Sequence, residues 1–313
     1  MLRKIVFIIV VFVLLIPAAS FAQDDMELPE EVIIERPGFT PEGIEWDAER
    51  GRFLVGSIVE GSIFEVMDDG THAAFIEDED LVSSIGIEID PINDRLLVAN
   101  SNAAVFADPT AGIAMLGAYD LETGERLFMA DLTAVTPDST YFANDVAVDE
   151  KGNAYITNSF APIIWKVDME GNASVFVEDE RLISEGFGMN GIVYHAHLFL
   201  LVAVAGTGEI YKIPLDDPAG MSLVELGQPI SADGMVILSD GHLVVVDAAS
   251  ASVLEIMSED EWASGTVIAA SSGHENATTA AVRDDEVYVV NAYFDDPERE
   301  TYDIVHVIFE AME

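Results

Sequence analysis

The sequence contains no cysteine among its 313 residues. Thiolate metal sites, iron–sulfur clusters and cysteine nucleophiles are therefore excluded, and so are disulfides. A chain of this length is long enough to bury a large apolar core. The fold must consequently be held together by packing and hydrogen bonding alone.

Positive charge is scarce as well. The chain has 13 Lys and Arg against 58 Asp and Glu, a formal net charge of -45 at pH 7. Such a surface repels phosphate groups, so we expect no nucleic-acid partner and no docking on anionic lipid. The simplest interpretation is a self-repelling surface that keeps the protein soluble, and the same field attracts cations.

Long hydrophobic runs are missing except at the N-terminus. Arg3 and Lys4 precede an apolar run over residues 5–16, and the small-x-small triplet Ser20-Phe21-Ala22 follows. The run is shorter than the ~20 residues of a membrane-spanning helix, and the layout is typical of a secretory signal peptide. We expect residues 1–22 to be a cleaved signal and residues 23–313 to be one secreted or periplasmic domain without membrane contact. An uncleaved N-terminal anchor is the alternative.

The 3.6-residue hydrophobic period of helices is absent from the rest of the chain, where six segments instead repeat one pattern. Each has a short apolar strand, a turn rich in Asp, Asn or Gly, and a second strand, and further short strands often follow. In chain order they are EGIEWDAERGRFLVGS, IGIEIDPINDRLLVAN, NDVAVDEKGNAYITNS, NGIVYHAHLFLLVAV, DGMVILSDGHLVVVD and TTAAVRDDEVYVVNA. Short strands recurring every ~45 residues predict an all-β, six-bladed β-propeller.

Two features complete this architecture. The strand-like residues 32–36 and 304–310 are left over at the termini, so we expect them to pair in one shared blade and close the ring. The interval between the second and third repeats is the longest. It holds AAVFADPTAGIAML and TAVTPDSTYFA, which we interpret as lid loops over one face.

The first residue of each repeat is expected to point toward the central axis, because the innermost strands of a propeller line its channel. We call these six positions the door residues: Glu42, Ile85, Asn144, Asn190, Asp233 and Thr278. Four of them offer a carboxylate or amide oxygen. Converging oxygens favour Ca²⁺, which takes 6–8 oxygen ligands, whereas Zn²⁺ prefers His or Cys and Mg²⁺ a stricter octahedron. A water-filled polar channel is the alternative.

Four of these segments also carry a family resemblance. PEGIEWD, ANDVAVDEKGNAYITNS, MNGIVY and ADGMVI resemble the signature segments of the SMP-30/gluconolactonase/LRE family, which is related to the paraoxonases and the diisopropylfluorophosphatase-like phosphotriesterases. The resemblance covers nearly the whole mature chain. It implies a six-bladed propeller, which we expect to be monomeric, with one calcium ion in the channel. By motif match the ligands are Glu42, Asn144, Asn190 and Asp233.

Two positions depart from the pattern of that family. Its gluconolactonase-like members have an Arg that holds sugar hydroxyls where this chain has Phe142, and the paraoxonases have a His where it has Ile85. The substrate class of neither branch therefore transfers. We expect a small-molecule substrate, an apolar lactone or ester rather than a sugar lactone.

The resemblance also implies a reaction. Calcium with open coordination positions acts as a Lewis acid on a carbonyl or phosphoryl oxygen. In the resembling phosphotriesterases the nucleophile or general base is the aspartate that matches Asp233. Asp145 is a second candidate, with a turn-forming or outer-shell role as its alternative. The sequence thus predicts a calcium-dependent hydrolase of lactones, esters or phosphotriesters.

Other functions stay open at this point. A non-catalytic propeller could use a structural calcium and bind a ligand or partner on its top face. Relatives resembling strictosidine synthase perform condensation chemistry without this metal set. A second calcium deeper in the channel has no ligands that the sequence assigns.

Histidines and aromatic residues add weaker signals. His195 and His197 could form a metal pair, but we expect them in a turn away from the axis. Aromatic residues near the mouth could wall a substrate pocket, although inter-blade packing is the interpretation we favour for most of them. They are Trp46, Tyr141, Phe142, Phe160, Phe187 and Tyr194.

Overall fold

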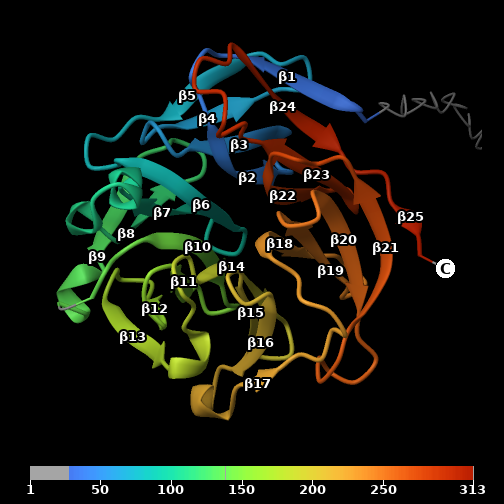
Figure 1. The fold of residues 1–313 in the computed structure, drawn as a ribbon. Helices are drawn as coiled ribbons and strands as arrows, with labels where there is room; N and C mark the ends of the chain where they lie inside the picture. The colour runs from blue at the N-terminus through green and yellow to red at the C-terminus, as the bar shows by residue number, and fades with distance from the viewer. Residues whose placement is uncertain (1–27, 138, 313) are drawn as a thin grey trace, which may run out of the picture.

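The computed structural model describes residues 28–137 and 139–312. Its strands form six antiparallel sheets, the blades, around a central axis (Figure 1). The innermost strands of neighbouring blades contact one another, and the last of them contacts the first, so the ring is closed. The structure is the all-β, six-bladed propeller expected from the repeats. The expected signal peptide lies outside the described residues.

Blades 1 to 3 each contain four consecutive strands, given from the axis outward. Blade 1 contains β2 (Pro41–Asp47), β3 (Arg52–Ser57), β4 (Ile63–Val66) and β5 (His72–Ile76). Blade 2 contains β6 (Ser83–Asp90), β7 (Arg95–Ser101), β8 (Met115–Asp120) and β9 (Arg126–Asp131). Blade 3 contains β10 (Ala143–Val148), β11 (Ala154–Asn158), β12 (Ile163–Val167) and β13 (Ala173–Glu178).

Blades 4 to 6 include the strands from the two ends of the described chain. Blade 4 contains β14 (Met189–His195), β15 (Phe199–Val204), β16 (Glu209–Pro214) and β17 (Ser222–Leu223). Blade 5 contains β18 (Ala232–Ile237), β19 (Leu243–Asp247), β20 (Ser252–Met257), β21 (Thr266–Ser272) and β25 (Glu310–Ala311). Blade 6 contains β22 (Ala277–Arg283), β23 (Glu286–Asn291), β24 (Thr301–His306) and β1 (Glu31–Glu35).

Helical structure in the described residues is limited to short 3-10 turns in the connections. They are η1 (Ala103–Phe106), η2 (Pro109–Ala111), η3 (Thr133–Val135), η4 (Glu180–Leu182) and η5 (Pro218–Gly220). None of these helices has the length or apolar character needed to cross a membrane. The two expected lid loops contain η1, η2 and η3, and both connect strand ends at the same end of the blades as the door residues.

The ring is closed by the two ends of the chain, as expected. β1 is the outermost strand of blade 6 and pairs antiparallel with β24. The expectation of one strand over residues 304–310 is wrong in its second half. After His306 the chain crosses to the neighbouring blade, where β25 pairs with β21. This crossing covers the outer edge of blade 5, which would otherwise present unpaired backbone groups.

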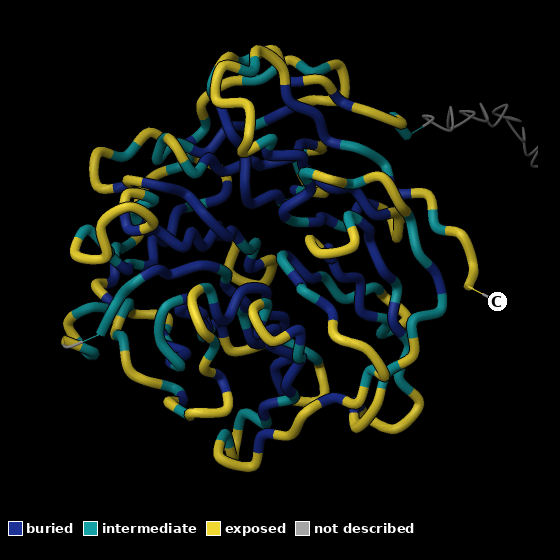
Figure 2. Tube along the Cα trace, viewed as in Figure 1, coloured by how far each residue is buried: buried dark blue, intermediate teal, exposed yellow. Residues whose placement is uncertain are grey.

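Apolar residues gather between neighbouring blades. Six of the buried clusters in the described residues lie one at each blade-to-blade interface. β7 and β15 are buried at every position (Figure 2). This burial explains the continuous apolar sequence of β15 and the apolar run Leu96–Ala99 between the polar ends of β7. Burying apolar surface at ~25 cal/mol per Å² across six interfaces is the main stabilising term of the fold.

Two buried arginines connect neighbouring blades on the side opposite the doors. Arg95 of blade 2 contacts Asp90 at 2.9 Å and donates to the carbonyl of Gly152 in blade 3 at 2.5 Å. Arg52 of blade 1 contacts Asp47 and donates to the carbonyl of Leu121 in blade 2. Because each guanidinium satisfies a carboxylate and a carbonyl together, these buried charges are compensated.

Candidate functional site

The door residues occupy an irregular part of every inner strand. In all six blades the register between the first and second strands shifts at this point, for example between Pro41 and Ile44 or between Met189 and Ile192. Such a β-bulge leaves residues without a ladder partner and re-aims their side chains. The bulge is therefore the local structure that can turn the door residues out of the blade and toward the axis.

Close approach of the inner strands explains the glycines that follow the doors. A Cβ on Gly191 would lie 2.3 Å from the carbonyl oxygen of Asp233, and one on Gly43 would lie 2.3 Å from that of Ile85. Both distances are shorter than any real contact, so only glycine fits. The backbone of each blade thus reaches the door of the next blade.

The structure brings together three of the four expected ligands, namely Glu42, Asn190 and Asp233. The amide nitrogen of Asn190 donates to Asp233 Oδ1 at 2.8 Å. Glu42 is 6 % exposed, and its pKa is raised well above the ordinary value, first by burial and then by the negative charges of Asp233 and Asp145. Asn144, which directly precedes Asp145, is buried and donates its amide nitrogen to Ser159 Oγ at 2.8 Å.

One oxygen of this group has no partner. Glu42 Oε2 is buried and makes no hydrogen bond in the structure. Leaving a buried carboxylate oxygen unsatisfied costs about 1–3 kcal/mol or more. The amide nitrogens of Asn144 and Asn190 are already engaged, which leaves their amide oxygens as the available donor atoms. Two carboxylates and two amide oxygens form a donor set that fits Ca²⁺.

The two catalytic candidates differ in their contacts. Both oxygens of Asp145 accept backbone N–H groups, from Val146 at 2.9 Å and from Ile192 in the next blade at 3.0 Å. Asp233 accepts one hydrogen bond, on Oδ1. Burial raises the pKa of each to about 7, against the lowering effect of these hydrogen bonds. Asp233 thus keeps a free oxygen, whereas Asp145 braces two inner strands.

Hydroxyl groups on and beside the inner strands fix the backbone at the doors. Thr157 donates to the carbonyl of Asn190 and Thr278 to that of Glu42, each at 2.8 Å. Ser159 accepts from the Asn144 side chain and donates to the carbonyl of Met189 in the next blade. Sequence reasoning missed these positioning roles, although the run ITNS places two hydroxyls at the end of a strand in a repeat.

A second pair of carboxylates follows the doors on blades 1 and 2. Glu45 lies three residues after Glu42, and its side chain is hydrogen-bonded to that of Glu88. Burial raises the pKa of Glu45 to about 8 and also raises that of Glu88, to which the charges of Glu45, Asp145 and Asp90 add. Two carboxyl groups in contact can share one proton, so the pair does not hold two charges at neutral pH.

Because of the Glu45–Glu88 pair, we expect the stability of the protein, measured with a chelator present, to depend on pH. The folded pKa of Glu45 is above its ordinary value of 4.5, so the folded state binds more protons than the unfolded state between 4.5 and about 8. Stability contributed by this proton is present at low pH and is lost as pH rises through that window. We expect the melting temperature to fall between about pH 5.5 and pH 8. Glu88→Gln should make the melting temperature fall less over this pH range. Glu122→Gln, which removes the same charge from an exposed turn, should leave the fall unchanged. An equal pH dependence of the melting temperature in the two variants would contradict the assignment of this effect to the Glu45–Glu88 pair.

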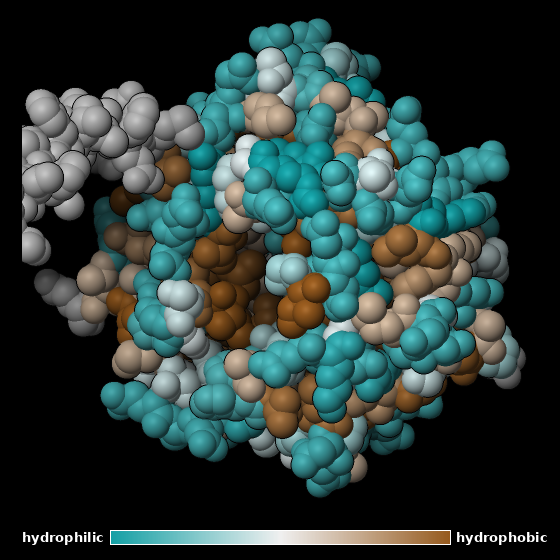
Figure 3. Space-filling view, turned by 180° about the vertical axis from the view of Figure 1, so that it is seen from behind, coloured by the Kyte–Doolittle hydropathy of each residue, from teal (hydrophilic) through white to brown (hydrophobic). Residues whose placement is uncertain are grey.

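Aromatic residues gather beside the doors. Ile85, Val105 and Phe142 form a small buried cluster with the partly buried Phe160 and Phe187 packed against it. Phe142, Phe160 and Phe187 lie in connections at the door end of the blades, where they pack on residues of neighbouring blades, so the interpretation of inter-blade packing holds for them. Trp46, in contrast, packs on Phe53 and under the guanidinium of Arg283. Figure 3 views the molecule from behind relative to Figure 1 and shows a hollow near the middle of the ring with hydrophobic residues inside it.

His195 and His197 lie away from the doors. The ring of His195 stacks on Phe199 with centroids 4.4 Å apart and lies 4.8 Å from the ring of His197. Both residues are at the end of β14 or in the turn that follows it, at the far end of the strand from Asn190. This placement agrees with the expectation of a turn away from the doors.

Another group of potential metal ligands lies at the surface of blade 5. Ligand atoms of Asp240, His242 and Glu255 lie within 4.8 Å of one another, and no ion is established there. His242 Nδ1 contacts Glu255 at 2.7 Å and Asp240 at 3.2 Å, so these groups already satisfy one another. The orphaned oxygen of Glu42 makes the doors the better candidate for a metal.

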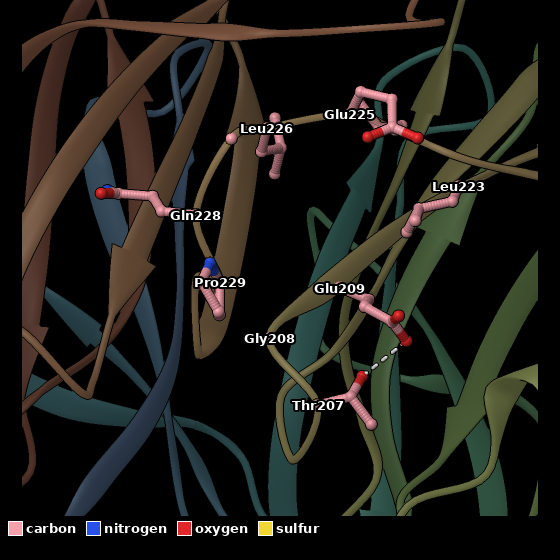
Figure 4. A pocket seen from close by; sticks show the side chains of 10 residues that line it. Thr207, Gly208, Glu209, Leu223, Glu225, Leu226, Gln228 and Pro229 are labelled. Carbon is pink, nitrogen blue, oxygen red and sulfur yellow. Dashed lines mark hydrogen bonds between the residues drawn. The ribbon is translucent and has the colours of Figure 1, made fainter.

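A surface hollow between two blades has no door residue in its lining. One of about 350 Å³ between blades 4 and 5 is lined by Thr207–Glu209 and residues 223–229 (Figure 4). Its Glu209 accepts hydrogen bonds from Thr207 at 2.9 Å and from Tyr211 at 3.2 Å. Both bonds end on Oε2 of this partly exposed side chain, and no residue of this hollow is among the described residues with a buried, unpartnered side-chain atom.

Comparisons with known proteins show a shared fold. No protein-family model and no curated protein matches the sequence. The structure is similar to Mala s 1, the major allergen of Malassezia sympodialis, at 18% identity and a TM-score of 0.76, covering 90% of this chain and 97% of that one. It is also similar to the calcium-binding protein regucalcin from Agrobacterium tumefaciens, at 17% identity, TM-score 0.61 and coverage of 90% and 95%. A luciferin-regenerating enzyme follows at 13% identity, TM-score 0.62 and coverage of 90% and 96%.

These neighbours establish a shared six-bladed architecture at low identity. At this level of identity the similarity shows the fold and not an activity.

Proposed function

We propose that this chain is a calcium-dependent hydrolase of the SMP-30/gluconolactonase type that acts on an apolar lactone, ester or phosphotriester outside the cytoplasm. The observation that carries the proposal is the buried, unpartnered oxygen of Glu42 beside a second carboxylate, Asp233, which is bonded to Asn190. Burying two carboxylates this close together without a cation is costly. The calcium-binding neighbour regucalcin shares the fold, which adds support.

We assign the residues of this chain separate roles at such a centre. Glu42, Asn144, Asn190 and Asp233 hold the ion, which when bound polarises a carbonyl or phosphoryl oxygen. Asp233 is the residue we assign as nucleophile or general base, because one of its oxygens accepts no hydrogen bond from protein. Asp145 is assigned a positioning role, because both of its oxygens are occupied by backbone N–H groups.

The apolar substrate follows from the two departures from the family pattern. Ile85 and Phe142 replace the residues that carry polar recognition in resembling enzymes, and here they pack against each other in one buried cluster. A wall of this kind offers no hydrogen bonds to sugar hydroxyls. Leaving such hydroxyls unpaired disfavours a polar substrate by a large factor.

A direct test is hydrolysis of aryl esters, aliphatic lactones and phosphotriesters by the purified protein, with calcium and with EDTA. The proposal predicts turnover that EDTA abolishes and added calcium restores. If calcium raises the melting temperature but no substrate is turned over, the ion is structural and the alternative of a ligand-binding propeller is favoured. If calcium has neither effect, both are wrong.

The Ser159 hydroxyl gives a second prediction for this centre. Ser159→Ala removes the group that orients Asn144, so calcium affinity should fall about 10-fold or more. Ser101→Ala is the matched control, because Ser101 is the equivalent residue of blade 2 and donates to the carbonyl of Ala143 without contacting an expected ligand side chain. Calcium titration by calorimetry measures both. An equal loss of affinity in the two variants would contradict the role of Ser159.

A further inference from the structure

Four phenylalanine rings form one continuous cluster at the door end of the propeller. Phe106, Phe142, Phe160 and Phe187 contact one another in all six pairs, with ring centroids 5.1–6.4 Å apart. They come from connections in blades 2, 3 and 4 that the sequence separates widely. Edge-to-face and offset arrangements at these distances are the favourable ones for aromatic rings.

Three of the four rings are connected to the candidate metal centre through the backbone. Asn158 Oδ1 accepts the backbone N–H groups of both Phe142 and Phe160 at 3.1 Å. The next residue, Ser159, contacts the side chain of Asn144. Phe187 lies three residues before Asn190 on the way into β14. Three of the rings and two of the expected ligands, Asn144 and Asn190, therefore share the same short backbone segments.

Phe106 differs from the other three rings. It ends η1, a 3-10 helix of 4 residues in the first lid loop, and it is 56% exposed. Phe142, by contrast, is 2% exposed and forms the floor of the cluster. Phe106 thus packs one part of its ring on Phe142, which itself packs with the door residue Ile85, and leaves the rest of the ring exposed. A bare aromatic surface of this kind gains free energy when another ring packs on it.

We propose, on the basis of the proposed function, that the substrate carries an aryl group that packs on this cluster, and that Phe106 is the residue that selects aryl over alkyl substrates. The remaining rings form the fixed wall, and Phe106 supplies the accessible aromatic face. An alkyl group of similar size would gain the burial but not the additional ring–ring interaction. Sequence reasoning did not single out Phe106, whose only signal is its place in the insertion AAVFADPT.

The first experiment compares two esters of the same acid, phenyl acetate and ethyl acetate, in calcium. Phe106→Ala should lower kcat/KM for phenyl acetate by about three- to tenfold and leave that for ethyl acetate nearly unchanged. Phe294→Ala is the matched control, because Phe294 is 55% exposed in another connection at the same end of the blades and belongs to none of these ring pairs. Equal effects of the two variants on phenyl acetate would overturn the assignment.

A second experiment does not depend on turnover. Binding of 4-fluorobenzyl alcohol, a neutral aryl probe, is followed by ¹⁹F NMR in EDTA and in calcium. We expect Phe106→Ala to weaken binding several-fold and Phe294→Ala not to do so. If neither ester is hydrolysed but the probe still binds in a Phe106-dependent way, the hydrolase fails and the aryl site stands. If esters are hydrolysed and the probe does not bind, the aryl site is wrong.

Discussion

Glu42→Gln is expected to change stability in opposite directions with and without calcium. In EDTA the variant should be more stable than wild type by about 1–3 kcal/mol, because a buried carboxylate without a partner is replaced by a neutral amide of the same shape. In calcium it should be less stable. Wild type gains about 4 kcal/mol at a calcium concentration a thousandfold above Kd, and the variant loses much of this gain. Urea denaturation in both conditions gives the two differences.

The control for this pair of measurements is Glu122→Gln, which removes the same charge from an exposed turn. It should change stability little in either condition. A Glu42→Gln protein that keeps the full stabilisation by calcium would show that Glu42 is not a ligand. A variant that is destabilised in EDTA would show that its carboxylate has a partner in solution.

Arg95→Met is expected to destabilise the protein by about 3–5 kcal/mol. The Arg95 and Asp90 side chains are 2% and 1% exposed, and methionine keeps most of the side-chain volume while leaving the carboxylate uncompensated. The carbonyl of Gly152 in the next blade loses its donor at the same time. Chemical denaturation at fixed calcium concentration measures the loss.

Two further variants make this prediction specific. Arg126→Met removes the ion pairs to Asp78 and Asp80, in which the arginine is 40% exposed, so its cost should be about 1 kcal/mol or less. The double variant Asp90→Asn/Arg95→Met should recover much of the loss, because no buried charge is then left alone. If Arg95→Met costs no more than Arg126→Met, the buried pair does not stabilise the blade-to-blade contact.

The repeats predicted the fold because each blade is a local unit whose strands follow one another in the chain. Alternation of strands and turns is a short-range signal, and its recurrence from Glu42 to Thr278 fixed the number of blades. The end of the chain was predicted less well. Residues 307–310 are apolar enough to continue β24, but the crossing to β21 depends on which blade edge is open, and that is a property of the closed ring.

The candidate site was predictable in part for the same reason. Door residues recur at a fixed place in each repeat, so Asn190 and Asp233 could be expected near each other, and they are hydrogen-bonded. Contacts between blades carry no such local signal. Examples are the Ser159 contact with Met189, the carboxyl pair of Glu45 and Glu88, and the packing of Phe106 on Phe142. Each depends on how neighbouring blades meet at the axis.

The most direct test of the central claim is a crystal structure grown in calcium, with the ion identified by its anomalous scattering. We expect one ion on the axis, about 2.3–2.6 Å from carboxylate oxygens of Glu42 and Asp233 and from the amide oxygens of Asn144 and Asn190. Glu42 paired with a protonated partner or a water molecule, with no ion between the four side chains, would contradict it.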